Sequence, residues 1–181
     1  MTKAVVEEDF VEIPVGVEVT VEGKQATVKG ALGELKRDFS HASVIINKED
    51  AKIHVEMAWP RKREATLVRT ICSHIRNMII GVTKGFTYKL KIVFSHFPIS
   101  VKIEGDKVKI ENFCGERSPR IAKIVGNVKV SVEGEDVVVR GIDLNEVSQT
   151  ASNIEAATKI KNKDSRVFLD GIYVYDKIEG M

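Results

Sequence analysis

The stretch Val21-Glu22-Gly23, followed by Val28 and Gly33-Glu34, occurs a second time as Ile103-Glu104-Gly105, Ile110 and Gly115-Glu116. The same 82 positions separate each pair of counterparts (103 − 21, 110 − 28 and 115 − 33). Composition alone does not readily produce a fixed offset that holds at both apolar and glycine positions. The pattern therefore predicts a tandem duplication, in which two small domains share one architecture. Two copies are too few for a solenoid, which needs at least about three units to bury its core.

The duplication divides the 181 residues into expected domains at 1–82 and 83–181. Each half is long enough to build a modest core without disulfides or metals, because that difficulty begins below roughly 70–80 residues. Apolar residues make up 43% of the chain, which suits ordinary globular packing.

The first half reads as strands followed by a helix. Residues 13–22 alternate apolar and polar positions, which predicts a strand with one solvated face. Hairpins are expected around Gly23-Lys24 and around residues 47–52, and Gly30 and Gly33 bracket a further turn. Apolar residues from Leu67 to Ile79 then follow a 3.6-residue period, which predicts a helix between Pro60 and Gly81.

The second half repeats this order, with a strand at 86–94 and hairpins around Gly105-Asp106 and residues 133–136. Asp143 stands three residues before Glu146, a spacing that predicts a capping box at the start of a second helix. The expected fold is α+β: a tandem duplication of a small antiparallel or mixed β-sheet domain with one packed helix each.

Charge is concentrated in one window of the chain. The 28 basic and 26 acidic residues give a net charge of only +2, yet residues 61–91 hold eight basic residues and one acidic one, Glu64. That window is +7 (8 − 1), so the remainder is −5 (2 − 7). Such a localised field would attract an anionic partner to one face. A solvated charged helix would give the same pattern.

Several function classes find no support in the sequence. Cys72 and Cys114 form no C-x-x-C, and Cys72 falls in the apolar stripe, so a core thiol in a reducing compartment is expected. The four histidines lack metal-ligand spacing, and no Walker loop or nucleophile motif occurs. No apolar run approaches the roughly 20 residues that a bilayer demands. We therefore expect a cytoplasmic protein without catalytic residues, metal, cofactor, small-molecule substrate or membrane partner.

The tail departs from the repeat. Residues 159–166 are polar and basic, and Val167–Tyr175 then reads as a strand interrupted by Gly171. Cations beside exposed aromatic side chains can neutralise phosphates and approach sugars and bases. A closing β-strand with a charged lead-in is the alternative interpretation.

Four sets of residues carry a resemblance to a known family: Val28-Lys29-Gly30 with Arg37-Asp38-Phe39, Thr70–Ile75 with Asn77-Met78-Ile79, His96-Phe97-Pro98-Ile99, and Lys161–Asp164 with Arg166 and Phe168–Val174. On these stretches the chain resembles large-subunit ribosomal proteins of the universal L-six family, called L-nine in eukaryotes. The last set resembles the eukaryotic branch. The resemblance covers nearly the whole chain and includes the internal duplication.

The resemblance implies a structural role in the large ribosomal subunit, near the sarcin–ricin loop and the stalk base. The implied partners are large-subunit ribosomal RNA, neighbouring ribosomal proteins and, transiently, translational GTPases. Members of the family bind RNA mainly through the second domain. Carried over residue by residue, the RNA face includes Lys161, Asn162, Lys163, Arg166, Gly171 and Tyr173.

Four further residues are candidates on other grounds. Charge and proximity add Lys159 and Lys177, and Arg117 and Arg120 follow the Gly115-Glu116 turn. Gly171 would allow close approach of its backbone to RNA, since it carries no Cβ. A protein–protein adaptor that uses exposed sheet edges or helix faces is the competing hypothesis.

Overall fold

The computed structural model describes residues 6–95, 97–161, 163–164 and 167–181. The chain divides into two compact units, Met1–Lys84 and Gly85–Met181. This division falls two residues after the expected boundary at 82/83 (84 − 82), because the first helix continues through Thr83. In the part of the chain that is described, no helix is both long and apolar enough to cross a bilayer.

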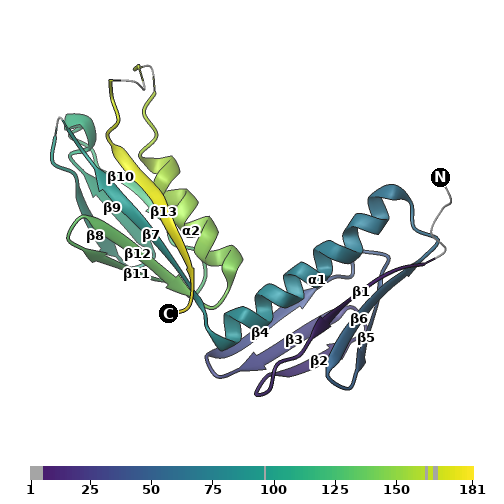
Figure 1. Ribbon diagram of the computed structural model, residues 1–181. Coiled ribbons are helices and arrows are strands. Elements are labelled where there is room, and N and C mark those ends of the chain that lie inside the picture. Colours follow the sequence, from purple (N-terminus) through teal and green to yellow (C-terminus); the bar gives the residue numbers. More distant parts are fainter. Residues whose placement is uncertain (1–5, 96, 162, 165–166) are drawn as a thin grey trace. The chain divides into compact units, whose positions relative to one another are not determined.

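The first unit places one helix against two antiparallel sheets (Figure 1). One sheet has the order β1-β6-β5 and the other the order β2-β3-β4. Helix α1 contacts strands of both sheets. The elements are β1 (Val6–Glu12), β2 (Glu18–Glu22), β3 (Gln25–Gly30), β4 (Gly33–Asp38), β5 (Ile45–Glu49), β6 (Lys52–Ala58) and α1 (Lys62–Thr83).

The second unit has the same plan with one more strand. Its sheets have the orders β10-β9-β8 and β11-β12-β7-β13, again all antiparallel, and α2 contacts both. The elements are β7 (Phe86–Val93), β8 (Ser100–Glu104), β9 (Lys107–Glu111), the 3-10 turn η1 (Phe113–Gly115), β10 (Arg120–Lys123), β11 (Lys129–Glu133), β12 (Asp136–Gly141), α2 (Leu144–Ala157) and β13 (Gly171–Glu179).

The predicted duplication and α+β class are confirmed. Strands β2 and β8 begin 82 residues apart (100 − 18), as do β3 and β9 (107 − 25) and the two helices (144 − 62). Strand β13 follows α2 and pairs with β7, whereas in the described part of the first unit β1 pairs only with β6. The extra strand therefore belongs to the tail that the sequence sets apart from the repeat.

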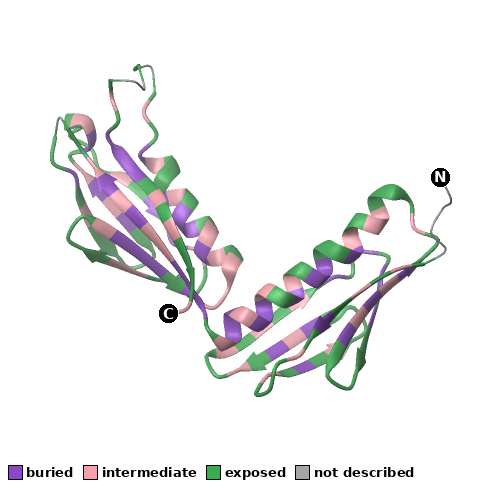
Figure 2. Cartoon of the chain, viewed as in Figure 1, coloured by how far each residue is buried: buried purple, intermediate pink, exposed green. Residues whose placement is uncertain are grey.

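Each helix buries one face against its sheets (Figure 2). In α1 the buried face includes Val68, Cys72 and Ile75, which pack with strand residues such as Val28 and Ile53. Burying one such side chain contributes about 1.5–3 kcal/mol, so this apolar stripe is the main tie between helix and sheets.

Three predicted boundaries are wrong. The strand expected at 13–22 starts only at Glu18, because Pro14 has no backbone N–H to donate and Gly16 turns the chain with φ +92°. The first helix does not end at Gly81 but continues to Thr83, with Gly81 buried. The last strand starts at Gly171 rather than at Val167.

The predicted capping box at α2 is half formed. The Asp143 carboxylate accepts a hydrogen bond from the backbone N–H of Asn145 at 2.8 Å, as an N-cap residue does. Glu146 instead accepts from the backbone N–H of Asn127 at 3.2 Å. Its carboxylate therefore ties the start of α2 to the loop before β11.

Candidate nucleic-acid interface

Three lysines of the tail lie between the end of α2 and the start of β13. Lys159, Lys161 and Lys163 are exposed, and none of them forms an ion pair with any other described residue. Elsewhere in this unit many lysines are paired with carboxylates, for example Lys102 with Glu111 at 2.7 Å. Within the described residues, no carboxylate therefore forms an ion pair with the tail lysines. We name Lys159, Lys161 and Lys163 the lysine edge.

Arg120 fixes the segment that carries the lysine edge. Its guanidinium donates to the backbone oxygens of Ala157 and Lys159 at 2.9 and 3.1 Å, at the carboxyl end of α2. It also forms a two-pronged ion pair with Glu116 at 2.6 and 2.9 Å and lies 4.2 Å from the centre of the Phe113 ring. Its side chain is only 26% exposed. Arg120 therefore positions the backbone of the tail, and four of its five N–H donors are occupied within the protein.

The ion pair also sets the protonation of Glu116. The hydrogen bonds from Arg120 hold the pKa of Glu116 below its ordinary value, against a smaller opposing effect of burial, and the positive charge of Lys163 acts in the same direction. Glu116 therefore stays ionised in mildly acidic solution.

Two further cations lie over aromatic rings. The ammonium of Lys163 is 4.4 Å from the centre of the Phe168 ring, and that of Lys177 is 5.4 Å from the centre of the Tyr88 ring. Such contacts hold a cation in place without neutralising its charge. Lys163 and Lys177 thus keep their capacity to meet an anion.

Gly171 lies beneath the side chain of Tyr173. It is buried, and a Cβ built on it would come within 2.8 Å of the Tyr173 ring. The side chain of Tyr173 therefore lies in the space that Gly171 leaves open. Tyr173 thus occupies the space beside the glycine, and the assignment of Gly171 to the RNA face stays a prediction.

The remaining predicted residues have two kinds of outcome. Arg117 is exposed and forms no ion pair with another described residue. Asn162 and Arg166 lie outside the described residues, so their assignment stays a prediction.

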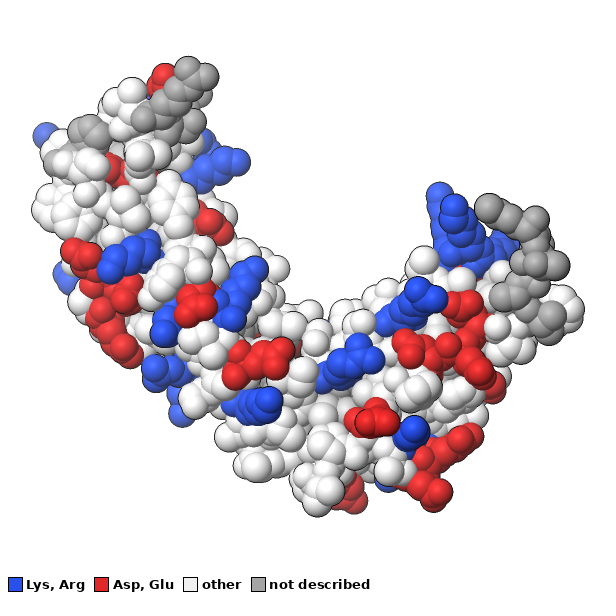
Figure 3. Space-filling view, in the orientation of Figure 1, with Lys and Arg blue, Asp and Glu red and all other residues white. Residues whose placement is uncertain are grey.

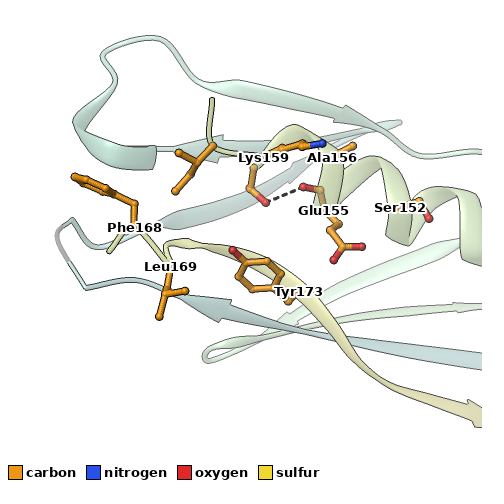
Figure 4. A pocket seen from close by; sticks show the side chains of 9 residues that line it. Ser152, Glu155, Ala156, Lys159, Phe168, Leu169 and Tyr173 are labelled. Carbon is orange, nitrogen blue, oxygen red and sulfur yellow. Dashed lines mark hydrogen bonds between the residues drawn. The ribbon is translucent and has the colours of Figure 1, made fainter. Parts of the chain in front are cut away.

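A hollow of about 590 Å³ lies beside the lysine edge, between the last turns of α2, the returning tail and β13 (Figure 4). A smaller hollow of about 190 Å³ adjoins it at Ile160 and contains Arg120, Lys161 and Lys163 in its lining. We name the larger one the tail hollow. It is lined by Ser152, Glu155, Ala156, Thr158, Lys159, Ile160, Phe168, Leu169 and Tyr173.

Buried Thr158 links two walls of the tail hollow. Its hydroxyl donates to the backbone oxygen of Glu155 at 3.0 Å and accepts from the backbone N–H of Ile172 at 3.0 Å. The end of α2 is thereby tied to the start of β13. Neither Ser152, Phe168 nor Leu169 is among the predicted site residues, although the last two flank Asp170-Gly171 in the sequence.

The basic window at 61–91 is divided between the two units. Its first part lies in the first unit, where Figure 3 shows basic side chains along α1, with Arg69 paired to Glu7 at 3.3 Å. Lys89 and Lys91 lie on β7 in the second unit, where Asp176, Glu135 and Asp136 pair with them. On the face in Figure 3, acidic side chains lie among the basic ones.

Cys72 is a residue of the hydrophobic core, as predicted. Cys72 is fully buried, and burial raises the pKa of its thiol to about 12. A thiol with such a pKa is not a nucleophile at neutral pH. Within the described residues no group of three or more potential metal ligands comes together.

These features describe a duplicated α+β scaffold with a cluster of exposed cations that have no carboxylate partner among the described residues, a pattern typical of proteins that meet a large polyanion. Comparison with known proteins identifies the family. The chain belongs to the ribosomal protein L6 family. The sequence model of this family matches residues 13–85 and 97–171, once in each half. The predicted family is confirmed, and the protein is a ribosomal protein rather than an enzyme.

Similar proteins match the chain almost from end to end. The large ribosomal subunit protein uL6 of Ignicoccus hospitalis is 53% identical over 180 residues, which cover 97% of both chains. That of Aeropyrum pernix is 54% identical over 178 residues and covers 98% of both. That of Methanosphaera stadtmanae is 52% identical over 170 residues, 93% of this chain and 92% of its own. These relatives are archaeal, in keeping with the resemblance to the eukaryotic branch.

Proposed function

We propose that this chain is a structural constituent of the large ribosomal subunit that binds ribosomal RNA through the lysine edge of its second unit. The name of its relatives, large ribosomal subunit protein uL6, supports the assignment to the large ribosomal subunit. The resemblance to the family supports a place near the sarcin–ricin loop and the stalk base. There it would support the binding region of translational GTPases on cytosolic ribosomes, beside neighbouring ribosomal proteins.

The observation that carries this proposal is the close spacing of the lysine edge, which gathers three exposed lysines within five residues, none with a carboxylate partner among the described residues. Lys89, Lys91, Lys102 and Lys109 have such partners. The other lysines of the second unit without one, Lys107, Lys123, Lys129 and Lys177, lie on four separate strands. Phosphates would supply the missing counter-charge and release condensed cations when they bind.

Because Arg120 holds the backbone at Lys159, part of the edge is ordered before RNA arrives. Less conformational entropy is then lost on binding.

The test is the salt dependence of binding between the full-length chain and a transcript of large-subunit ribosomal RNA. Each neutralised phosphate contributes a slope of about 0.7–0.9 in log affinity against log salt. Substituting Lys159, Lys161 and Lys163 together by glutamine should therefore reduce the slope by about 2–3. A charged contact is worth about 1.5–3 kcal/mol, so the loss of three contacts sums to about 4.5 kcal/mol or more, which corresponds to binding about 10³-fold weaker.

A matched control removes three exposed lysines from strands of the same unit, Lys107, Lys123 and Lys129, which also form no ion pair with another described residue. This variant loses the same charge, so a general field effect would weaken both variants equally. The proposal requires a much larger loss of slope in the lysine-edge variant. Equal losses, or a binding curve of the wild type that does not respond to salt, would contradict it.

A further inference from the structure

The tail hollow is an apolar recess at the base of the lysine edge. Its lining includes the rings of Phe168 and Tyr173 and the aliphatic side chains of Ile160 and Leu169. Leu169 is 56% exposed and Tyr173 is 43% exposed, so about half of the surface of each remains in water. Removing such apolar surface from water is favourable, at roughly 25 cal/mol per Å². A partner that fills the hollow would gain this free energy.

The charge around the hollow indicates the chemistry of that partner. Lys159 belongs to the lining, and Lys161 and Lys163 line the adjoining hollow that shares Ile160. An occupant that combines an apolar body with anionic charge on the side of the lysines would match both features. A nucleotide has this combination, because its base has two apolar faces and its phosphate is anionic.

We propose that the tail hollow receives one unstacked nucleobase of the bound RNA, with the flanking phosphates on the lysine edge. This inference rests on the proposed function and names the part of the RNA that the site takes. The base stacks on the ring of Tyr173, and Leu169 and Phe168 complete the apolar lining. Proteins that recognise single-stranded or bulged RNA hold splayed bases on aromatic rings in this way.

The hollow also has polar groups that suit the edge of a base. Ser152 and Glu155 line it from α2, and the Glu155 carboxylate forms no ion pair with another described residue. A carboxylate accepts hydrogen bonds from the amino groups of cytosine, adenine or guanine. A base that bears such an amino group is therefore the preferred occupant.

The stacking surface is built before RNA binds. Tyr173 lies over Gly171, where any Cβ would meet its ring, and Thr158 ties the next residue, Ile172, to the end of α2. The ring consequently gives up little freedom when a base stacks on it.

The experiment measures RNA binding by the full-length chain with substitutions at Tyr173. Stacking on one aromatic ring is worth about 1–3 kcal/mol, so Tyr173→Ala should weaken binding about 5- to 150-fold. Tyr173→Leu should lose as much, because leucine keeps the apolar volume but not the ring. Tyr173→Phe should bind within about twofold of the wild type. The salt slope should stay unchanged in all three, since no phosphate contact is removed.

Tyr175→Ala is the matched control. Tyr175 lies two positions further along β13 (175 − 173), is 55% exposed and does not line the hollow. The Tyr175→Ala variant should bind RNA as tightly as the wild type does. Thermal unfolding of each variant separates a loss of stacking from a loss of fold. A leucine variant that binds as tightly as the wild type would show apolar packing, such as that of a protein segment, and would overturn the inference.

Chemical probing of the complex supplies a second measurement. One base should have its Watson–Crick edge protected from dimethyl sulfate or carbodiimide in the wild-type complex and reactive in the Tyr173→Ala complex. Identical reactivity in both complexes would overturn the inference. Suppose that the salt dependence of RNA binding requires the lysine edge, but that Tyr173→Ala binds RNA as tightly as the wild type. The proposed base site is then wrong, while the proposed function stands. If the wild type does not bind RNA, the proposed function fails with it.

Discussion

Replacing Arg120 by alanine should destabilise the second unit. The guanidinium makes four hydrogen bonds, two to the backbone oxygens of Ala157 and Lys159 at the carboxyl end of α2 and two to Glu116, and it lies over the Phe113 ring. A charged hydrogen bond to the partly buried oxygen of Ala157 is worth about 1.5–3 kcal/mol. The half-exposed ion pair adds about 0–1 kcal/mol and the contact with the ring about 0.5–1 kcal/mol. Because such values do not add fully, we expect a loss of about 2–3 kcal/mol.

Thermal unfolding of the full-length chain measures this loss. For a unit of this size, about 1 kcal/mol corresponds to a shift in Tm of roughly 4–8 °C, so the transition of the second unit should move down by at least about 8 °C. Arg117→Ala is the control, because Arg117 is exposed and outside these contacts, and it should change the free energy of unfolding by less than about 0.5 kcal/mol.

Arg120→Lys separates a positioning role from direct contact with phosphate. Lysine keeps the charge but cannot reproduce the planar fork that reaches Glu116 and two backbone oxygens at once. The lysine variant should therefore lose much of the stability that the alanine variant loses. If Arg120→Ala unfolds at the wild-type temperature and yet binds RNA more weakly, with Arg120→Lys restoring binding, then Arg120 is an RNA ligand and the reasoning is refuted.

Three further predictions concern single groups. The pKa of Glu116 lies below its ordinary 4.5, so its ion pair stabilises fully above that value and is lost as the pH falls through the lower folded-state value. The stability difference between the wild type and Glu116→Gln in urea unfolding should therefore close below pH 4.5, and a difference that stays constant into strong acid would contradict this. Gly30→Ala should cost about 1–3 kcal/mol, because a Cβ would lie 2.8 Å from the backbone oxygen of Val82, and an unchanged urea midpoint would refute it. Iodoacetamide at neutral pH should modify half-buried Cys114 well before Cys72, whose thiol has a pKa of about 12; equal rates would show that Cys72 is accessible.

The elements that the sequence predicts are those with a regular apolar period. The stripe from Leu67 to Ile79 is the buried face of α1, and the alternation around Val28, Ile53 and Val108 marks strands. Strand β4 was not predicted, because in Gly33–Asp38 only Leu35 has a large apolar side chain and positions 34 and 36–38 are charged. Its place in the sheet comes from pairing with β3, a contact that no local period encodes.

In the candidate site, too, some features follow from the local sequence and others depend on contacts between distant segments. The exposed cations of the lysine edge can be read from composition along the tail, because exposed lysines need no tertiary partner. The positioning role of Arg120 cannot be predicted from the sequence, because its backbone partners at Ala157 and Lys159 lie 37 and 39 residues away along the chain. The tail hollow is likewise formed by α2 and β13 together, so neither segment alone indicates it.

The most direct test of the account is ultraviolet crosslinking of RNA to protein in large ribosomal subunits purified from cells that make this chain. We predict that the chain sediments with the subunit and that its crosslinked peptides come from residues 159–177, with Tyr173 among the modified positions. A chain that stays in the light fractions, as a protein–protein adaptor would, contradicts the account. So do crosslinks confined to the first unit, Met1–Lys84.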